Sequence, residues 1–259
     1  MASAVEPIGH GHFRATIPDG WQQGRGAFGG LVLGTLLRAI RSSQPEVARE
    51  VRTLAGDLCG PVKPGAADIH VRVLRRGSHQ ANVAAELSQD NLLLATATAV
   101  LSEARPSPAP VTRLTPPVAE DWRAQELIPI APPIGPDFAV HYEYRTGGPL
   151  PFSGHAEPVC LGWVRERCRP APLDAPAIIG LLDAWWPTLF SIEQGPRPCA
   201  TVQFTAELFG IPASLDAQSP LRHRSEMIAL REGFFLESRE LWHGDTLVAL
   251  NQQTFAILR

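Results

Sequence analysis

The sequence predicts an α+β protein built from two similar halves, each with a central helix wrapped by a curved antiparallel β-sheet. Three observations lead to this prediction. Each half carries an almost wholly apolar helix, a run of strand-like segments follows each helix, and a proline-rich stretch separates the halves. One such unit exposes a sheet edge and an apolar face, so the two units are expected to pair.

The first half opens on a glycine-rich segment that leads into a buried helix. The helix is expected over Leu31–Ile40, where apolar residues occupy almost every face. Pro45 supplies the stop, because a helix usually ends at or before the residue preceding a proline. The strands expected after it are Val51–Leu58, Asp68–Val73, Ala81–Leu87 and Leu92–Leu101.

A proline-rich linker follows the first set of strands. Glu103–Phe138 holds nine of the 25 prolines, and proline removes backbone donors and fixes φ. This stretch is therefore expected to be extended and to pack over a surface. The predicted organisation is an N-terminal half at 1–104, a linker at 105–137 and a C-terminal half at 138–259.

The second half repeats the pattern. A helix is expected from Pro172 or Leu173 to about Phe190, with one strand before it and four after it. The expected strands are Val159–Arg167, Cys199–Phe209, Ser225–Arg231, Phe235–His243 and Leu247–Leu258.

The halves can be aligned residue by residue. Leu58-Cys59-Gly60 aligns with Leu208-Phe209-Gly210, and Glu86-Leu87 aligns with Glu240-Leu241. We also align Leu74–Gly77 with Leu230–Gly233. An internal repeat of this length indicates two copies of one structural unit.

Composition excludes several classes of function. The net charge is −3, so no basic surplus is present to neutralise a nucleic-acid backbone. No apolar stretch reaches the roughly 20 residues that a membrane-spanning helix needs. Residues 1–6 lack the basic start and apolar core of a signal peptide. We therefore expect a cytoplasmic protein that binds neither nucleic acid nor membranes.

The four cysteines and eight histidines do not indicate a metal site. No CxxC pair or HExxH motif is present, and the cysteines stand mostly in or beside strand-like segments. Unpaired structural thiols are expected, with no metal and no cofactor.

Five short motifs, in this order along the chain, resemble one known family. They are Gly24–Gly30, Gly60–Gly65, Arg75–Gly77, Trp163–Arg165 and Leu173–Ala175. Together with the order of elements, they resemble the hotdog fold, in particular the double-hotdog acyl-CoA thioesterases related to bacterial acyl-CoA thioesterase II. The resemblance implies a double hotdog that hydrolyses a fatty or other acyl-CoA in lipid metabolism. It also implies a homo-oligomer, a dimer of double hotdogs.

The same resemblance implies the catalytic residues. In that family an Asp on the second helix, a Thr or Ser on the next strand and a Gln on the last strand hold a water, and the matching positions are Asp183, Thr201 and Gln253. Gly29 and Gly30, before the first helix, are expected to bind substrate, because backbone N–H groups at a helix start can polarise a carbonyl. Glycines there are also compatible with plain packing.

Comparison of the halves supports this choice. The alignment places Asp183 over Leu37, Thr201 over Val51 and Gln253 over Ala99, so each polar residue is replaced by an apolar one. A buried carboxylate is costly unless it is hydrogen-bonded. One functional site in the second half explains the asymmetry better than structural need does.

Several alternatives remain open at the level of sequence. Strand alternation puts Thr201, Gln203 and Thr205 on one face, and Asn251 on the same face as Gln253. Asp183 is compatible with activating a water or with attacking the thioester directly. A serine thioesterase of the α/β-hydrolase type is disfavoured, because no GxSxG motif is present. The rival functions are a hotdog enoyl-CoA hydratase and a non-catalytic acyl-CoA-binding protein.

Overall fold

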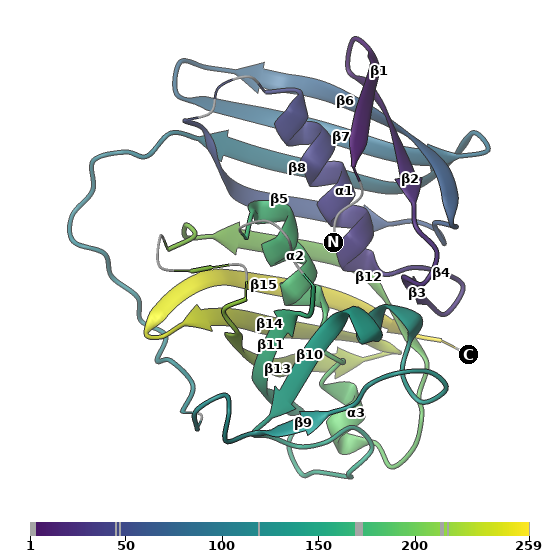
Figure 1. Cartoon of the computed structure of the whole chain (residues 1–259), viewed down its shortest axis with the longest axis vertical. Coiled ribbons are helices and arrows are strands. Elements are labelled where there is room, and N and C mark those ends of the chain that lie inside the picture. Colours follow the sequence, from purple (N-terminus) through teal and green to yellow (C-terminus); the bar gives the residue numbers. More distant parts are fainter. Residues whose placement is uncertain are drawn as a thin grey trace.

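The protein forms one continuous, strongly curved antiparallel sheet that wraps around two adjacent helices (Figure 1). The computed structural model describes residues 4–44, 46, 48–118, 120–168, 173–212, 215–216 and 218–258. Within these ranges the large sheet has 13 strands, in the order β1-β2-β6-β7-β8-β5-β12-β15-β14-β13-β11-β10-β9.

The sheet divides into two sets of strands at its middle. The first set is β1 (Val5–Gly9), β2 (His12–Ile17), β5 (Glu50–Leu58), β6 (Gly65–Arg76), β7 (Gln80–Gln89) and β8 (Leu92–Ser102). The second set is β9 (Glu126–Ile128), β10 (Tyr142–Thr146), β11 (Val159–Glu166), β12 (Cys199–Leu208), β13 (Leu221–Arg231), β14 (Phe234–His243) and β15 (Thr246–Ile257). The two sets join where β5 pairs antiparallel with β12, with Ala55 opposite Thr205.

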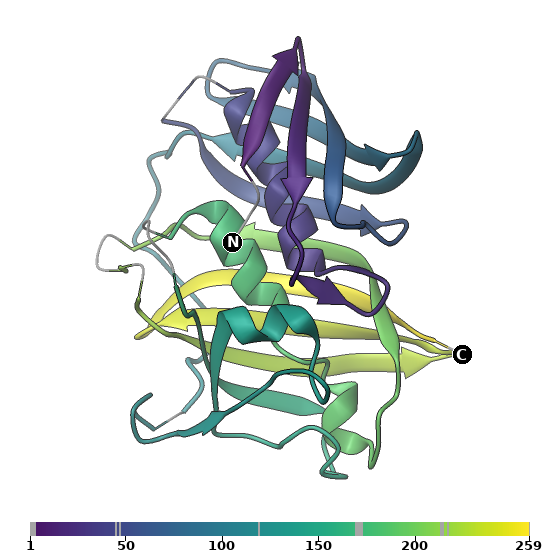
Figure 2. The same ribbon diagram turned by 45° about the vertical axis from the view of Figure 1, so that its right-hand side comes forward.

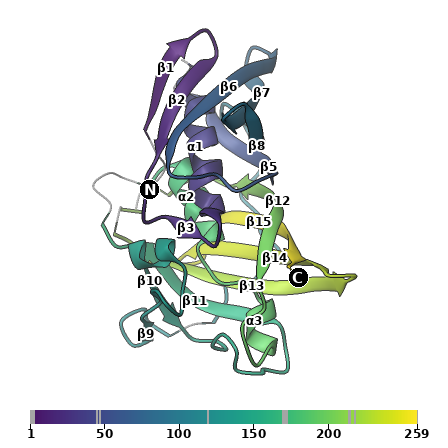
Figure 3. The ribbon, with the colours of Figure 1, turned by 90° about the vertical axis from the view of Figure 1, so that its right-hand side faces the viewer.

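The two long helices lie next to each other on the inner side of this sheet, as Figures 2 and 3 show from two further directions. Helix α1 spans Gly29–Ser42 and ends three residues before Pro45, as expected. Helix α2 spans Ala175–Asp183, and the Asp174 carboxylate caps its start by accepting a hydrogen bond from Ala177 N–H (3.0 Å). Gly30 meets Gly180 at the crossing, where a Cβ on Gly30 would lie 2.9 Å from Gly180 Cα.

The second helix is shorter than the sequence predicted. We expected it to continue to about Phe190, but α2 ends at Asp183 and a separate short helix, α3, covers Leu189–Ile192. Pro187 lies between them and cannot continue a helix interior, because it has no N–H group and its ring clashes with the preceding turn. Pro172, the earlier of the two expected starts, lies outside the described residues.

The strand registers confirm most of the alignment between the halves. Thr201 is opposite Phe255 just as Val51 is opposite Leu101, and Leu241 is opposite Ala249 as Leu87 is opposite Ala95. The alignment of Leu74 with Leu230 is wrong by two residues. The bulge at Leu74 matches the bulge at Ile228, and both hairpins close with two-residue turns, so Gly77 and Gly233, which the alignment matched, stand at different places in the two hairpins.

Residues 104–115 of the linker are exposed, and its later part is anchored to the second half by a buried tryptophan, by hydrogen bonds to backbone carbonyl groups and by strand pairing. Trp122 is buried, with the guanidinium groups of Arg145 and Arg165 each 4.5 Å from its ring centroid. The linker region also contains β9 and runs into a 3₁₀ helix, Asp137–His141. A small hairpin of β3 (Gln22–Gln23) and β4 (Gly26–Ala27) precedes α1.

All four cysteines are unpaired thiols, which confirms the prediction. Burial raises the pKa of Cys160 well above its ordinary value and that of Cys199 to about 12, so these thiols stay protonated at neutral pH. None of the helices formed by the described residues has the length and apolar character that a bilayer crossing requires.

Candidate active site

Asp183 is the last residue of α2, and its carboxylate lies against the first turn of α1. Its side chain is almost fully buried, with 8% of the residue exposed. Gly30 N–H donates to Oδ2 at 2.7 Å, and Gln253 Nε2 donates to Oδ1 at 2.7 Å. Both oxygens are therefore held, one by each half of the molecule.

Gln253 links Asp183 to Thr201. Its Nε2 also donates to Thr201 Oγ1 at 2.6 Å, so the three predicted side chains meet at one amide group. Gln253 Oε1 is buried and has no hydrogen-bond partner within the described part of the chain. An unpaired acceptor in such a position suits a group that can donate to it, such as a water.

A β-bulge turns Thr201 toward the site. Register shifts between Thr201 and Gln203, so Thr201 and Phe204 fall on the inner face of the sheet while Gln203 is exposed. Strict alternation had grouped Thr201 with Gln203 and Thr205. The bulge separates them, and Thr205 Oγ1 donates to the backbone of Gln252 instead.

The side-chain amide of Asn251 makes its hydrogen bonds away from Asp183. It shares the inner face with Gln253, but its Nδ2 donates to Thr205 O at 2.6 Å and to Gln252 O at 3.1 Å. The geometry thus favours Gln253, and not Asn251, as the amide that contacts Asp183.

Burial raises the pKa of the Asp183 carboxyl above its ordinary value. The positive charge of Arg239 and the hydrogen bonds from Gln253 and Gly30 act in the opposite direction, and burial exceeds them. A carboxylate with a raised pKa is a stronger base than an exposed one, which is suited to taking a proton near neutral pH.

Gly29 and Gly30 allow α1 to approach the carboxylate closely. A Cβ on Gly29 would lie 2.9 Å from Asp183 Oδ2 and 2.9 Å from Leu58 Cδ1. The Gly30 N–H is directed at Asp183, so in this structure it positions the carboxylate. Substrate binding by the two glycines stays a prediction.

Comparison with known families decides the assignment. A model of the acyl-CoA thioesterase N-terminal domain matches residues 17–102, and a model of the acyl-CoA thioesterase C-terminal domain matches residues 108–257. The chain belongs to the acyl-CoA thioesterase family.

Solved structures similar to this acyl-CoA thioesterase family member share its fold over the whole chain. A protein of unknown function with a hot dog fold from Alicyclobacillus acidocaldarius has a TM-score of 0.89 at 24% identity, covering 100% of this chain and 97% of that one. The acyl-CoA thioesterase II TesB2 from Mycobacterium marinum has a TM-score of 0.76 at 16% identity, covering 98% and 96%. The prediction of an α+β double hotdog is confirmed. A search of the curated proteins found no match.

Two charged residues beside the site of this thioesterase family member were not predicted from its sequence. Glu237 and Arg239 lie on the inner face of β14 with 0% and 1% of their surface exposed. They form an ion pair with Arg239 Nη2 2.9 Å from Glu237 Oε2. A signal was present, because charged residues interrupt the inward apolar positions of this strand between Phe235 and Leu241.

The inner faces of the two halves differ at six positions. At each of them the strand registers place a buried apolar residue of the first half over a buried polar residue of the second. The pairs are His223 and Ile69, Ser225 and Val71, Glu237 and Val83, Arg239 and Ala85, Asn251 and Ala97, and Gln253 and Ala99. The polar asymmetry expected at three positions thus extends across the sheet beneath α2.

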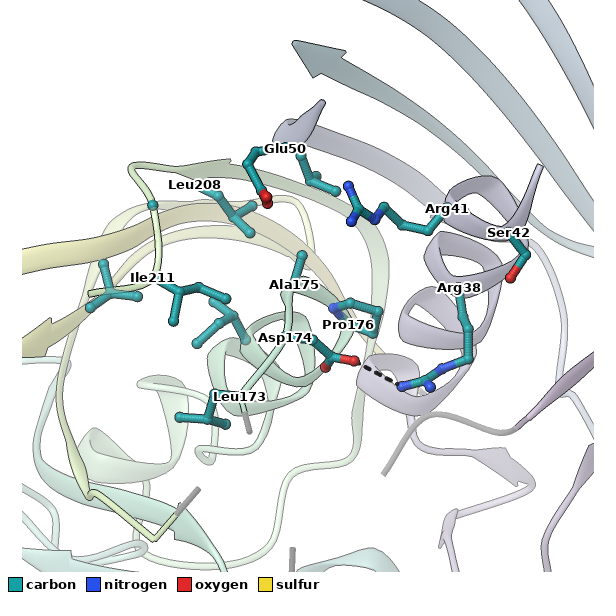
Figure 4. A pocket seen from close by; sticks show the side chains of 14 residues that line it. Arg38, Arg41, Ser42, Glu50, Leu173, Asp174, Ala175, Pro176, Leu208 and Ile211 are labelled. Carbon is teal, nitrogen blue, oxygen red and sulfur yellow. Dashed lines mark hydrogen bonds and ion pairs between the residues drawn. The ribbon is translucent and has the colours of Figure 1, made fainter. Parts of the chain in front are cut away.

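A cavity of about 600 Å³ lies at the opposite end of the helix pair. Figure 4 shows Arg38 and Arg41 of α1 on one side of it and Leu173, Leu208 and Ile211 on the other, with Arg38 paired to Asp174 at 3.2 Å. At 1.5 Å per residue, the nine residues from Asp174 to Asp183 span roughly 13 Å, so this cavity is separate from the carboxylate.

The described ranges contain no group of three or more His, Cys, Asp or Glu side chains arranged to hold a metal ion.

Proposed function

We propose that this protein hydrolyses an acyl-CoA thioester to the free acid and coenzyme A, with Asp183, Thr201 and Gln253 as catalytic residues. The observation that carries the proposal is the contact of Asp183 and Thr201 with one amide nitrogen of Gln253, at 2.7 and 2.6 Å. Membership of the acyl-CoA thioesterase family supports the substrate class.

In the proposed reaction Asp183 acts as a general base. It removes a proton from a water as the water oxygen adds to the thioester carbonyl carbon. Thr201 and the free Oε1 of Gln253 orient that water by hydrogen bonds. The tetrahedral intermediate then collapses, the carbon–sulfur bond breaks, and protonated Asp183 returns the proton to the coenzyme A thiolate.

In this proposal the start of α1 stabilises the negative charge that develops on the carbonyl oxygen. Backbone N–H groups in the first turn carry a partial positive charge. Gly29 and Gly30 leave no side chain between this turn and Asp183, which supports a substrate-binding role for them.

Direct attack by Asp183 is the alternative route to the same products. The carboxylate would form a mixed anhydride with the acyl group, which water would then hydrolyse. Single turnover in ¹⁸O-water tests for the anhydride route. Heavy oxygen found in the side chain of Asp183 indicates an anhydride that water opens at the Asp183 carbonyl, whereas label confined to the released acid is expected both from the general-base route and from an anhydride opened at the acyl carbonyl.

Thiol release from a panel of acyl-CoAs of increasing chain length tests the proposed function. We expect turnover of at least one acyl-CoA, and a loss of about 10²–10⁴-fold in kcat for Asp183→Asn, since the general base is removed. Equal rates in both proteins would overturn the assignment of the site. Binding of acyl-CoA without thiol release would favour a binding protein, and hydration of an enoyl-CoA would favour a hydratase. Cytoplasmic location and a homo-oligomer stay predictions.

A further inference from the structure

The ion pair of Glu237 and Arg239 is unusual because both charged side chains are fully buried. Both side chains are essentially inaccessible, and the half-equivalent positions hold Val83 and Ala85, also buried. Removing two charges from water is costly, and a buried pair often stabilises a fold no better than apolar residues do. The first half forms the same fold without such a pair. We therefore expect the ion pair to have a function that is specific to the second half.

Arg239 holds the end of the helix that carries Asp183. Its Nη1 donates to the carbonyl oxygens of Leu182 (3.1 Å), Asp183 (3.5 Å) and Trp185 (3.2 Å). The last carbonyls of a helix have no partner within the helix and carry partial negative charge. The guanidinium group satisfies them and fixes the backbone of Asp183.

Glu237 binds the chain just before the next helix. Its Oε1 accepts hydrogen bonds from the backbone N–H (2.5 Å) and the hydroxyl (2.6 Å) of Thr188, just before α3, while Oε2 binds Arg239. The two residues therefore bracket the chain from Leu182 to Thr188 at both ends. That segment includes Pro187, where the helical path breaks.

The pair also sets the charge around Asp183. The positive charge of Arg239 opposes the effect of burial on the Asp183 carboxyl, and Glu237 balances that charge. Burial and Arg239 keep the pKa of His223 well below its ordinary value, so this neighbour remains neutral. The titratable and charged groups packed around this cluster are Tyr144 on β10, Cys160 on β11, Cys199 on β12, His223 on β13, and Glu237 and Arg239 on β14.

We propose that Glu237 and Arg239 are positioning residues for the reaction: together they fix the end of α2, and Arg239 places near the Asp183 carboxylate a positive charge that Glu237 balances, without either residue contacting the substrate. This inference rests on the proposed function of Asp183. It predicts that the two residues affect kcat and its pH dependence and leave KM almost unchanged.

The test combines three variants with two measurements. The variants are Arg239→Met, Glu237→Gln and the double variant. The first measurement follows the ¹³C carboxyl signal of Asp183 against pH, with the signal assigned by its loss in Asp183→Asn. The second measures kcat and KM for thiol release.

The single variants are expected to move the Asp183 titration in opposite directions. Arg239→Met removes the compensating positive charge, so the midpoint rises by about one pH unit or more and kcat at pH 7 falls at least about tenfold. Glu237→Gln leaves that charge unbalanced, so the midpoint falls. The neutral double variant restores the midpoint toward wild type but keeps a low kcat, because the hydrogen bonds of Arg239 to the helix end are lost.

An ion pair on the opposite face of the sheet serves as the control. Arg224 and Glu240 pair at 2.7 Å between β13 and β14, and the Arg224→Met, Glu240→Gln variant is expected to leave the Asp183 midpoint and kcat unchanged. Folded single variants whose midpoint and kcat both match wild type would overturn the proposal. So would a double variant with wild-type kcat, which covers the case in which the single variants do not fold.

The two measurements separate this proposal from the proposed function. If no protein releases thiol while the Asp183 midpoint still shifts in opposite directions, the thioesterase assignment fails and the positioning of Asp183 stands. If thiol release depends on Asp183 but neither variant changes the midpoint or kcat, only the role of the pair fails.

Discussion

Asp183 lies between two helix ends that carry opposite partial charges. It stands at the C-terminus of its own helix, where partial negative charge disfavours a carboxylate, and against the first turn of α1, where the Gly30 N–H favours one. Burial adds a further cost, and the pKa is raised as a result. The residue is thus poised for proton transfer at the expense of stability.

The raised pKa gives a prediction for stability against pH. Folded Asp183 binds its proton more tightly than unfolded Asp183, so its contribution is complete below the unfolded pKa and is lost as pH rises through the folded pKa. Asp183→Asn should therefore raise Tm at pH 7, by about 2–4 °C for a gain of about 1 kcal/mol. Calorimetry checks this. The gain should vanish near pH 3, and a variant less stable than wild type at pH 7 would contradict the argument.

Thr201→Val tests the hydroxyl without disturbing the packing, since Val51 occupies the equivalent buried position of the first half. We expect kcat to fall by about 10–100-fold, because Gln253 and the water lose a hydrogen-bond partner, with little change in stability. Thr205→Val, beyond the bulge, is the matched control and should retain full kcat. Equal losses in both variants would count against the specific role of Thr201.

The site could be predicted only in part from individual residues. The resemblance and the apolar counterparts indicated Asp183, Thr201 and Gln253, which the structure brings together. Alternation could not separate Thr201 from Thr205, because a bulge leaves no reliable mark in a single sequence. Glu237 and Arg239 were missed because two charges on a strand are ordinarily read as solvent-facing.

Among the elements, α1 and α2 depend on a close crossing at two glycines. Gly30→Ala would place a Cβ 2.6 Å from Phe28 Cζ and 2.9 Å from Gly180 Cα, so the helices must separate. We expect a loss of about 1–3 kcal/mol in the free energy of unfolding from overpacking. We also expect a lower kcat, because the N–H that holds Asp183 moves. Denaturant unfolding and thiol release check both.

Gly9→Ala provides the comparison, because a Cβ at Gly9 meets nothing within 4 Å. It should leave stability and kcat near wild-type values. If Gly30→Ala proved equally harmless, the close approach of α1 to Asp183 would not be needed.

Most strands, the end of α1 and, to within about two or three residues, both helix starts followed from sequence pattern, whereas the end of α2 and the outer strands did not. The apolar run through Trp185 and Trp186 hid the end of α2, which tertiary contacts and Pro187 determine. The outer strands β1, β2, β9 and β10 were not predicted, because edge strands need less apolar character on either face.

At the scale of the whole molecule, the two halves share one sheet and one site. Their pairing was predicted from the exposed edge of each unit, but the strands that meet, β5 and β12, could not be identified from pattern alone. Because Gly30 and Gln253 come from different halves, the carboxylate is held only when the halves are docked.

The covalent connection through the exposed part of the linker should be dispensable once the halves have docked. Residues 104–115 are exposed throughout, so a protease site inserted between Val111 and Thr112 can be cut without breaking core contacts. We expect the cut fragments to elute together and to keep the kcat of the uncut protein. Each fragment expressed alone should fail to give a folded protein. Separation of the cut fragments as folded monomers would contradict this picture.

The place of β15 in the sheet determines when activity can first arise during synthesis. This strand is synthesised after β12, β13 and β14, yet it lies between β12 and β14 and carries Gln253. Until it inserts, the C-terminal strands have no continuous path of hydrogen bonds to the rest of the sheet, and Asp183 lacks its amide partner. A nascent or truncated chain that stops before Thr246 would therefore be inert toward acyl-CoA, however well its first half had folded.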